Sequence, residues 1–411
     1  MKVFEPEYIV RYAKEHCPYY AGLYRDLPED FSWEDIPLVD QKDYWSSNLS
    51  HLTGRQMDGQ VFKSGGTTGE PKYSYYSHDE WVTFCEGTGM NLPKGGLKYG
   101  DRVENLFYGG GLYASFLYTY SMMCLSPAHV LQFSLSGNVE TEEMVSTLVK
   151  HDINVMAGLP SVIMKIIDYI DRNKTEGIKL EVIYFAGETL YPEQREKIRS
   201  VLKRDIEFRS VAYASNDGGL IGYFSRDCGF NEHRACDMLC KVEIIDDETG
   251  EVITEKGRPG KLYITALYRT LMPIIRYPAG DMAEYMEDEN IPDRRFKLLG
   301  RSEEAARVAY VAIYPEDVNT ILRDLDIAFD TEQLILTREN NKDKLTIYIA
   351  GEPQTSRNDD IISALKAARP MLLEAEELNI ICGTEVVWCS LDGLQYNKRT
   401  GKLKRIIDDR K

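Results

Sequence analysis

The chain is predicted to be an α/β protein with a large N-terminal domain and a small α+β C-terminal domain. Its 411 residues are too many for one hydrophobic core and predict two or more domains. Between about residue 75 and residue 300, helical segments alternate with short apolar runs, which is typical of a parallel or mixed sheet covered by helices. After residue 300 a shorter series of strand and helix patterns begins. We therefore divide the chain into residues 1–300 and 301–411.

Within the large domain, apolar runs and amphipathic segments follow one another in order. The predicted strands cover residues 153–157, 182–186 and 209–213, and the predicted helices cover residues 161–172 and 192–202. Around residues 242–265 the pattern changes to β-hairpins with Gly-containing turns. Ligands of such sheets bind at the carboxyl ends of strands. Candidate site residues that closely follow a predicted strand are Gly158, Gly187 and Asp217.

The small domain has its own alternation of strands and one helix. Strands are predicted at residues 334–337, 344–350 and 385–388, and a helix at residues 359–369. The sequence contains no internal repeat and no low-complexity tract.

The composition excludes several classes of protein. The formal net charge is −17 and there is no long basic run, whereas proteins that bind nucleic acids or anionic membranes need a positive surface. The sequence contains no run of eighteen apolar residues, so no membrane span is predicted. Residues 1–20 lack the apolar region of a signal peptide. The eight cysteines are therefore expected to be reduced thiols in a cytoplasmic protein.

Residues 64–72 have the composition of a loop that holds phosphate. Their glycines allow a tight turn that brings N–H groups near an anion, and their hydroxyls and lysine supply further donors. These residues are Ser64, Gly65, Gly66, Thr67, Thr68, Gly69 and Lys72. Glu70 and Pro71 precede the lysine, so this is not the ordinary P-loop, in which lysine follows glycine directly. The alternative is a flexible surface loop.

A carboxylate lies shortly after the predicted strand that ends at Tyr213. Residues 213–219 read Tyr-Ala-Ser-Asn-Asp-Gly-Gly. The Asp217 carboxylate can hold Mg²⁺ against a phosphate, and the Tyr213 ring can lie against a purine or an aryl substrate. The alternative is an ordinary turn, which Asn-Asp-Gly-Gly also favours.

Two further segments carry charges suited to a nucleotide. Residues 276–281, Arg-Tyr-Pro-Ala-Gly-Asp, end in Asp281, whose two carboxylate oxygens match two vicinal ribose hydroxyls. Residues 397–405, Asn-Lys-Arg-Thr-Gly-Lys-Leu-Lys-Arg, form a basic segment in an acidic chain. The alternatives are a surface turn and a solvated C-terminal face, respectively.

Taken in order, these segments resemble the acyl-adenylate-forming superfamily, and within it the phenylacetate–CoA ligase branch. The resemblance begins at residues 36–44, Ile-Pro-Leu-Val-Asp-Gln-Lys-Asp-Tyr, and continues to the last residues. It implies a large adenylate-forming N-terminal domain and a small, mobile C-terminal domain that rotates about the hinge residue Glu303. It also implies that ATP, Mg²⁺, a carboxylic acid and coenzyme A take part in the reaction.

The resemblance assigns roles to individual residues. Lys402 in Thr-Gly-Lys is expected to enter the active site and stabilise the charge that develops as the acid attacks the α-phosphate. Asp217, an aspartate where the family has glutamate, is expected to bind Mg²⁺. The residues expected to bind the nucleotide are Ser64, Gly65, Gly66, Thr67, Thr68, Gly69, Lys72, Gly187, Glu188, Tyr213, Ala214, Ser215, Asn216, Asp281 and Arg301.

The acid pocket of the family corresponds to residues 106–116, Leu-Phe-Tyr-Gly-Gly-Gly-Leu-Tyr-Ala-Ser-Phe. Tyr108, Tyr113 and Phe116 could hold a flat aryl acid between them. The alternative is that these aromatic residues belong to the core.

A separate group of cysteines and a histidine suggests a metal. Cys228, His233, Cys236 and Cys240 could complete a tetrahedral, structural Zn²⁺ site, and related sequences carry such groups after the same motif. The alternative is three buried thiols and a surface histidine.

One residue, Tyr310, prevents the sequence from identifying the acyl acceptor. Tyr310 falls where family members that use coenzyme A usually have glycine, and its side chain could obstruct the thiol channel or alter the backbone of the loop. The alternatives to coenzyme A are an amine, a carrier-protein thiol or a cysteine of this chain, for which Cys382 and Cys389 are available in strand-like, core surroundings.

Two further readings of the whole chain are a nucleotide-binding regulator without catalysis and a zinc-stabilised interaction protein. Relatives in this branch are often homodimers, and no residue pattern here identifies an interface.

Overall fold

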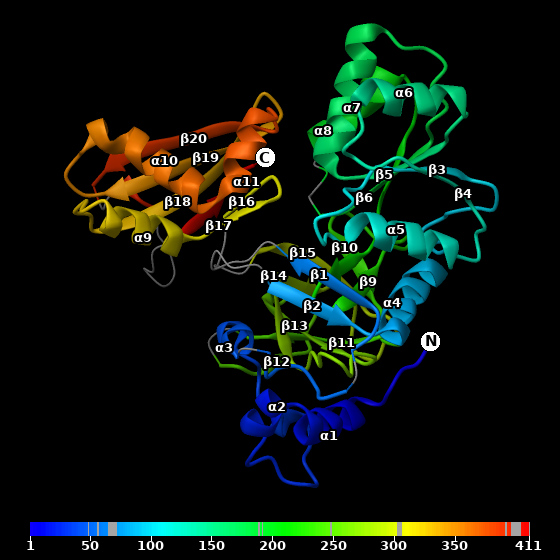
Figure 1. The fold of residues 1–411 in the computed structure, drawn as a ribbon, viewed down its shortest axis with the longest axis vertical. Coiled ribbons are helices and arrows are strands. Elements are labelled where there is room, and N and C mark those ends of the chain that lie inside the picture. The colour runs from blue at the N-terminus through cyan, green and yellow to red at the C-terminus, as the bar shows by residue number, and fades with distance from the viewer. Residues whose placement is uncertain are drawn as a thin grey trace. The chain divides into compact units, whose positions relative to one another are not determined.

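The computed structural model describes most of the chain. The described residues are 1–47, 49–55, 57–64, 72–187, 190, 192–246, 249–301, 306–390, 393–395 and 404–410. They form two compact units, one made of residues 1–64 and 72–300 and the other of residues from 301 onward. The prediction of a mixed α/β fold with a larger N-terminal and a smaller C-terminal part is confirmed (Figure 1). Among the described residues, no helix has the length and apolar character needed to span a bilayer.

The larger unit begins with short helices that pack against its core. They are α1 (Pro6–His16), α2 (Pro18–Leu23), the 3-10 helix η1 (Trp33–Asp35) and α3 (Gln41–Ser46). Proline occupies the first turn of α1 and α2, where its missing N–H costs nothing. The Asp40 side chain caps α3 by accepting a hydrogen bond from the N–H of Asp43 at 2.9 Å.

A five-stranded parallel sheet forms one part of the larger unit. Its order is β4-β3-β5-β6-β7, with helices on both faces (Figure 1). The elements are β3 (Arg102–Asn105), α5 (Ser115–Cys124), β4 (Leu131–Ser134), α6 (Thr141–Lys150), β5 (Val155–Gly158), α7 (Pro160–Asn173), β6 (Val182–Phe185), α8 (Pro192–Leu202) and β7 (Glu207–Ser210). Strand residues alternate between two cores, since Val155 and Ala157 pack in the core that includes α5, whereas Met156 packs with α6 and α7.

The strand order of this sheet reverses between β3 and β5, because the chain goes from β3 outward to β4 and then returns to β5. Ligands of open parallel sheets bind at such a reversal, outside the carboxyl ends of the strands. The loop after Asn105, which contains Tyr108 and Tyr113, leaves the sheet at this point.

An eight-stranded sheet and a hairpin complete the larger unit. The order of the sheet is β12-β11-β13-β14-β15-β10-β9-β8, and the hairpin pairs β1 with β2. The elements are β1 (Gln60–Ser64), β2 (Lys72–Tyr76), α4 (His78–Asn91), β8 (Tyr213–Ser215), β9 (Gly219–Tyr223), β10 (Glu232–Ala235), β11 (Cys240–Ile245), β12 (Val252–Ile253), β13 (Gly260–Ala266), β14 (Tyr277–Tyr285) and β15 (Arg295–Arg301).

The predicted strand at residues 209–213 is wrong in one respect. Strand β7 ends at Ser210 in the parallel sheet, and Tyr213 begins β8 in the eight-stranded sheet. Asp217 therefore lies in the tight turn between the antiparallel strands β8 and β9, not at the carboxyl end of a parallel strand. The apolar pattern is continuous across both strands, which is why the sequence suggested a single one.

The smaller unit has a four-stranded sheet in the order β20-β19-β18-β21 and a separate hairpin of β16 and β17. Its elements are β16 (Ala306–Val308), β17 (Val311–Ile313), α9 (Pro315–Asp324), β18 (Thr331–Glu339), β19 (Lys342–Ala350), the 3-10 helix η2 (Thr355–Arg357), α10 (Asn358–Ala368), α11 (Pro370–Glu377), β20 (Ile381–Cys389) and β21 (Ile406–Asp408).

The fully buried side chain of Gln333 binds two backbone positions that are far from it in the sequence. Its Nε2 donates hydrogen bonds to the carbonyl oxygens of Gln395 at 2.9 Å and Lys404 at 2.6 Å, and its Oε1 accepts one from the N–H of Gln395 at 3.2 Å. The N–H of Lys404 also donates to the carbonyl of Gln395 at 3.1 Å. The basic segment between these two residues thus starts and ends at a single place on the sheet.

Candidate active site

Asp217 is held by contacts to both oxygens of its carboxylate. Oδ1 accepts a hydrogen bond from Ser74 Oγ at 2.9 Å, and Oδ2 accepts one from the Tyr277 hydroxyl at 3.1 Å. Ser74 lies on β2, directly after the predicted phosphate loop, and Tyr277 begins β14. The carboxylate is therefore oriented by two strands that are distant from it in the sequence.

The main chain of the same turn is fixed as well. The Tyr76 hydroxyl donates to the carbonyl of Asn216 at 2.7 Å, and Arg269 donates to the carbonyl of Asp217 at 2.6 Å. Gly219 ends the turn with a φ of +72°, and a Cβ at this position would lie 1.7 Å from the Tyr268 hydroxyl oxygen. Only glycine fits there, since both the conformation and the space exclude a side chain.

The buried ion pair of Arg269 and Glu80 lies on the core side of this turn. The fully buried Arg269 guanidinium lies 3.6 Å from the centroid of the Tyr76 ring, and its Nε is 3.9 Å from Oε2 of Glu80. Oε1 of Glu80 accepts hydrogen bonds from the N–H groups of Thr270 at 2.6 Å and Leu271 at 2.7 Å. Because the two buried charges are paired and hydrogen-bonded, they form a rigid base for the turn.

Tyr213 and Asp281, two of the predicted nucleotide-binding residues, are in direct contact. The Tyr213 hydroxyl donates to Oδ2 of Asp281 at 2.5 Å. The Tyr213 ring packs near His233 and Phe296, with centroid distances of 5.7 Å and 5.9 Å. Tyr213 is thus fixed at both its ring and its hydroxyl.

Lys63, on β1, links the turn to the aromatic loop. Its carbonyl accepts a hydrogen bond from Asn216 Nδ2 at 3.2 Å, and its N–H donates to the carbonyl of Leu112 at 2.9 Å. Its ammonium lies 5.6 Å from the centroid of the Tyr113 ring. The strand that leads into the predicted phosphate loop therefore lies between the Asp217 turn and the predicted acid pocket.

The three aromatic residues of the predicted acid pocket are half-buried. Tyr108 and Phe116 close a loop in which the N–H of Phe116 donates to the carbonyl of Tyr108 at 3.2 Å. Residues 110–112 all have positive φ, which lets the chain reverse within a few residues and brings Tyr113 beside Lys63.

Lys72 and Gly187 are two further predicted nucleotide-binding residues that the structure describes. The Lys72 ammonium lies 5.4 Å from the centroid of the Trp45 ring. Gly187 follows β6 with a φ of +80°, and a Cβ there would lie 2.9 Å from a methyl carbon of Leu159. Ala214 is in β8, and Ser215 Oγ accepts a hydrogen bond from the N–H of Gly218 at 2.9 Å.

Several predicted site residues lie outside the described part of the chain. They are Gly65, Gly66, Thr67, Thr68, Gly69, Glu188, Glu303 and Lys402. For Ser64 and Arg301 the structure describes the backbone, at the ends of β1 and β15, but not the side chain.

Sequence reasoning missed Ser74, Tyr277 and Trp45. Ser74 closely follows the phosphate loop, and Tyr277 lies within the Arg276–Asp281 segment. Their nearness in sequence to predicted site residues could therefore have identified them, whereas a serine and a tyrosine by themselves indicate no particular role. Arg276 of that segment instead forms a buried ion pair, with its NH2 3.1 Å from Oε1 of Glu243.

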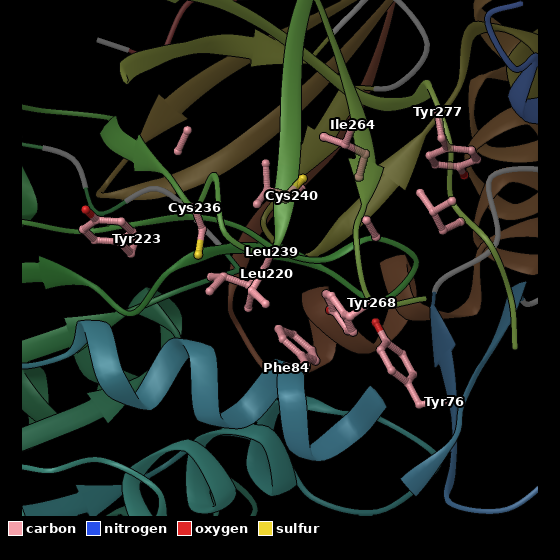
Figure 2. Close-up of a cluster of buried hydrophobic side chains, with 14 of the residues drawn as sticks. Tyr76, Phe84, Leu220, Tyr223, Cys236, Leu239, Cys240, Ile264, Tyr268 and Tyr277 are labelled. Atoms are coloured by element: carbon pink, nitrogen blue, oxygen red, sulfur yellow. The ribbon is translucent and has the colours of Figure 1, made fainter. Parts of the chain in front are cut away.

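The four predicted zinc ligands do not form a ligand group. Among the described residues, which include all of 228–240, no three His, Cys, Asp or Glu side chains converge on a metal position. His233 Nε2 is instead 3.0 Å from Ser210 Oγ, and Cys236 and Cys240 lie among apolar core side chains (Figure 2). Burial raises the pKa of Cys236 to about 12 and that of Cys240 well above its ordinary value.

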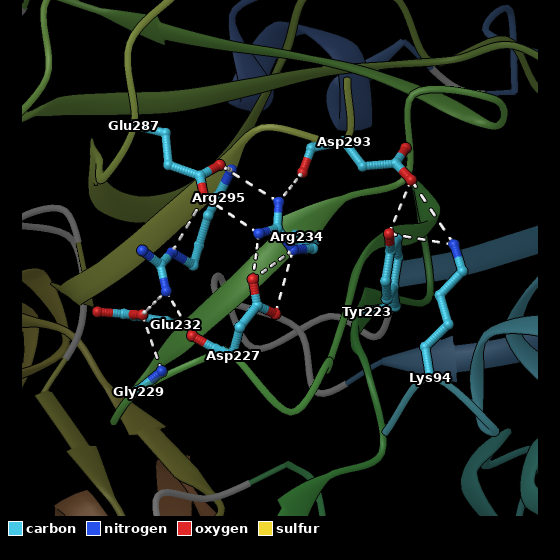
Figure 3. A network of polar contacts seen from close by, with 9 residues as sticks. All are labelled: Lys94, Tyr223, Asp227, Gly229, Glu232, Arg234, Glu287, Asp293 and Arg295. Carbon is cyan, nitrogen blue, oxygen red and sulfur yellow. Dashed lines mark hydrogen bonds and ion pairs between the residues drawn. The ribbon is translucent and has the colours of Figure 1, made fainter. Parts of the chain in front are cut away.

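The histidine is also buried, contrary to the alternative of a surface histidine. Its strand β10 is held by arginines and carboxylates (Figure 3). Arg234 contacts Asp227, with Nε to Oδ2 at 3.0 Å, and Glu287, with NH2 to Oε1 at 3.1 Å. Arg295 lies 3.6 Å from the same Glu287 carboxylate. Burial lowers the pKa of His233 to about 4, so its ring is neutral at pH 7.

Comparison with known proteins identifies the family. A family model described as "AMP-binding enzyme" matches residues 61–268, and one described as "AMP-binding enzyme C-terminal domain" matches residues 311–410. The chain belongs to the AMP-binding enzyme family. The resemblance to the adenylate-forming superfamily is thereby confirmed.

Relatives and solved structures extend over most of this AMP-binding enzyme. It is 25% identical over 438 residues to a phenylacetate-coenzyme A ligase of Thermus thermophilus, with 98% of this chain and 94% of the relative covered. A phenylacetate-coenzyme A ligase of Aromatoleum evansii is 23% identical, with 84% and 80% covered. The fold matches a crystal structure of 2-hydroxyisobutyryl-CoA ligase with a TM-score of 0.75 at 16% identity, covering 99% of this chain and 90% of that one.

The side chains of this AMP-binding enzyme fit a magnesium ion at Asp217. Mg²⁺ is usually bound by one or two carboxylates together with substrate phosphates and water. Each Asp217 oxygen accepts one hydrogen bond from a hydroxyl and has a lone pair left for a cation. When bound, Mg²⁺ would neutralise phosphate charge beside the loop that ends at Lys72.

Proposed function

We propose that this enzyme activates a carboxylic acid of the aryl or arylacetic class as its acyl-adenylate and then transfers the acyl group to the thiol of coenzyme A. The observation that carries the proposal is the convergence of the Asp217 turn, the Tyr213–Asp281 pair and the Lys63 strand on one region of the larger unit. The relatives named phenylacetate-coenzyme A ligase support both the acid class and the acceptor.

In this proposal each group of the chain has a separate task. Asp281, held by Tyr213, accepts hydrogen bonds from the ribose hydroxyls of ATP. Lys72 and the loop before it bind phosphate, and Asp217 binds the metal that accompanies ATP. Lys402 stabilises the charge that develops as the acid attacks the α-phosphate and pyrophosphate leaves. Tyr108, Tyr113 and Phe116 hold the acid.

The geometry near Tyr310 supports coenzyme A as the acceptor. Tyr310 lies in the two-residue turn between β16 and β17, and its side chain packs against the core of the smaller unit. Ala309, not Tyr310, carries the positive φ of this turn, 51°. The backbone at residue 310 therefore does not require glycine, which removes one of the two objections to a thiol acceptor.

A cysteine of the chain is a less favourable acceptor. Cys382 and Cys389 both lie on β20, and Cys382 is exposed, contrary to the expectation that both belong to the core. Partial burial raises the pKa of both thiols, and this lowers the fraction of reactive thiolate. An amine or a carrier-protein thiol remains the second candidate, because the bulk of the Tyr310 side chain is the objection to coenzyme A that the backbone geometry does not remove.

The test is pyrophosphate release from ATP and Mg²⁺ with a panel of aryl, amino and fatty acids. We expect release with aryl or arylacetic acids and a loss of about 10²- to 10³-fold in Lys402→Ala. Thioester formation with coenzyme A, measured for wild type and Tyr310→Gly, then identifies the acceptor. No release with any acid would favour the nucleotide-binding regulator, and release without thioester would favour another acceptor.

A further inference from the structure

Trp45 lies on the short helix α3, and hydrogen bonds connect the start of this helix to the residue just before strand β14. Asp40 caps this helix, and the N–H of Val39 donates to the carbonyl of Arg276 at 2.9 Å. Arg276 in turn donates to the carbonyl of Ile36 at 2.5 Å. The position of Trp45 is therefore determined by the start of strand β14, which also carries Tyr277.

Trp45, Tyr277 and Asp217 form a chain of two hydrogen bonds. The indole Nε1–H of Trp45 donates to the Tyr277 hydroxyl oxygen at 2.8 Å, and the Tyr277 hydroxyl lies 3.1 Å from Oδ2 of Asp217. An indole N–H can only donate, so the tyrosine oxygen must accept from it and direct its own proton to the carboxylate. The direction of both bonds is thus fixed.

Tyr277 is well placed to remain a donor. It is 1% exposed, and its ring meets that of Tyr44 edge-on with a centroid distance of 5.4 Å. The indole N–H on one side and the carboxylate on the other therefore hold the buried hydroxyl in one orientation.

The face of the same indole is directed at a cation of the phosphate loop. The Lys72 ammonium lies 5.4 Å from the Trp45 ring centroid, a distance typical of a cation–π contact. One side chain therefore contacts the lysine expected at the phosphates and, through Tyr277, the carboxylate expected at the metal.

We propose that Trp45 and Tyr277 are positioning residues for the metal–nucleotide complex: they orient the Asp217 carboxylate and set its place relative to Lys72. This inference rests on the proposed function, in which Asp217 binds Mg²⁺. Groups that orient a metal ligand typically change metal affinity by 10- to 100-fold when removed. Because Trp45 reaches Asp217 only through Tyr277, its effect on the metal should disappear once the tyrosine hydroxyl is gone.

The test compares the Mg²⁺ dependence of full-length variants. In Tyr277→Phe we expect the Mg²⁺ concentration for half-maximal pyrophosphate release to rise about tenfold, with the KM for the acid unchanged. Trp45→Phe should show a smaller rise, and Trp45→Phe in the Tyr277→Phe background should add nothing to it. Mn²⁺, which binds such sites more tightly, should restore most of the rate.

Tyr44→Phe is the matched control. Tyr44 is a fully buried tyrosine of the same aromatic cluster, and its hydroxyl donates to the carbonyl of Pro273 at 3.0 Å rather than to Asp217. Its Mg²⁺ dependence should equal that of wild type. If Tyr277→Phe and Tyr44→Phe lose rate equally with wild-type Mg²⁺ dependence, the role of Tyr277 is purely structural and the proposal is wrong.

Calorimetric titration of ATP into the same proteins, with and without Mg²⁺, separates this proposal from the proposed function. Mg²⁺ should increase ATP affinity in wild type about tenfold more than in Tyr277→Phe. This difference would support the inference even in a chain that turns over no tested acid, which would then contradict only the proposed function. An equal Mg²⁺ effect in all variants would overturn the inference. Thermal unfolding followed by circular dichroism verifies that each variant is folded.

Discussion

The guanidinium of Arg269 donates a hydrogen bond to the main-chain carbonyl of Asp217 at 2.6 Å, although the two residues are 52 positions apart in the sequence. This contact connects the buried core of the larger unit to the turn that carries the candidate metal ligand. Arg269 also contacts Glu80, which is itself buried and accepts hydrogen bonds from three backbone N–H groups. The stability of the fold and the geometry of the site therefore depend on the same pair.

Replacing Arg269 alone should destabilise the protein strongly. Arg269→Met leaves the buried Glu80 carboxylate with only the partly exposed Arg55, whose NH1 lies 3.8 Å from Oε1. Breaking a buried pair typically costs about 3–5 kcal/mol in the free energy of unfolding, and Arg55 should keep the cost near the lower end. Arg269→Met combined with Glu80→Gln should cost less than the sum of the two single changes, because no uncompensated charge remains. Urea unfolding of the four proteins measures this, and strict additivity would contradict it.

Removing the Tyr213 hydroxyl should weaken ATP binding specifically. A hydrogen bond to a charged group contributes about 1.5–3 kcal/mol, so Tyr213→Phe should raise the KM for ATP by about tenfold or more, with the KM for the acid unchanged. Tyr223→Phe is the matched control, since the Tyr223 hydroxyl donates to Oδ2 of Asp293 at 2.7 Å outside the candidate site (Figure 3). Equal KM values for ATP in both variants would refute the role given to the Tyr213–Asp281 pair.

His233 should make the protein sensitive to acid. Burial lowers its pKa to about 4 from an ordinary value of 6.5, so below pH 6.5 the unfolded chain binds the proton first. The contribution of His233 to stability is therefore complete above pH 6.5 and is lost as the pH falls toward 4, by on the order of 3 kcal/mol. Burial also lowers the pKa of His51 to about 4, so this residue adds a similar loss. His233→Asn should therefore remove about half of the total loss, whereas the exposed His129→Asn should leave it unchanged. Denaturant unfolding at pH 7 and pH 4.5 gives the comparison.

Glu104 should have the opposite pH dependence. It is fully buried on β3, and among the described residues neither carboxylate oxygen has a hydrogen-bond partner. Burial raises its pKa from 4.5 to about 8, so the contribution of Glu104 to stability is complete below pH 4.5 and falls as the pH rises to 8. At about 1.4 kcal/mol per pKa unit, Glu104→Gln should be more stable than wild type at pH 8 by up to roughly 4–5 kcal/mol.

The control for Glu104 is the exposed residue Glu181, just before β6. Glu181→Gln should leave the pH dependence of unfolding unchanged between pH 4.5 and pH 8. A Glu104→Gln variant whose stability falls over this interval as steeply as that of wild type would show that Glu104 does not carry the effect.

Local patterns in the sequence predicted the separate elements well and their arrangement less well. The predicted helix at residues 192–202 coincides with α8, because its apolar spacing and its first proline are local signals. The strand at residues 209–213 was divided between two sheets, since hydrophobic pattern does not record which neighbour a strand pairs with.

The same distinction applies to the site. Tyr213, Asp217 and Asp281 were recognisable from short motifs, and the direct contact of Tyr213 with Asp281 follows from the fold. The partners of Asp217 were not recognisable, because Ser74 lies 143 positions away and Tyr277 lies 60 positions away. The predicted zinc site failed for a related reason: suitable spacing did not make the side chains converge, and Ser210 contacts the histidine.

The hydrogen bonds of Gln333 have a consequence for how the basic C-terminal segment can vary. Since Gln395 and Lys404 are already joined at 3.1 Å, the entropic cost of closing the segment is met when the sheet folds. Doubling the length of such a loop would cost only about 0.6 kcal/mol more. A slip of β21 by one residue along β18 would instead move the point of emergence by roughly 3.3 Å and turn its side chains to the other face. The free energy of folding should thus change little when residues are inserted between 395 and 404, although an insertion that displaces Lys402 should impair adenylation. The pairing of β21 with β18 instead sets where the segment emerges.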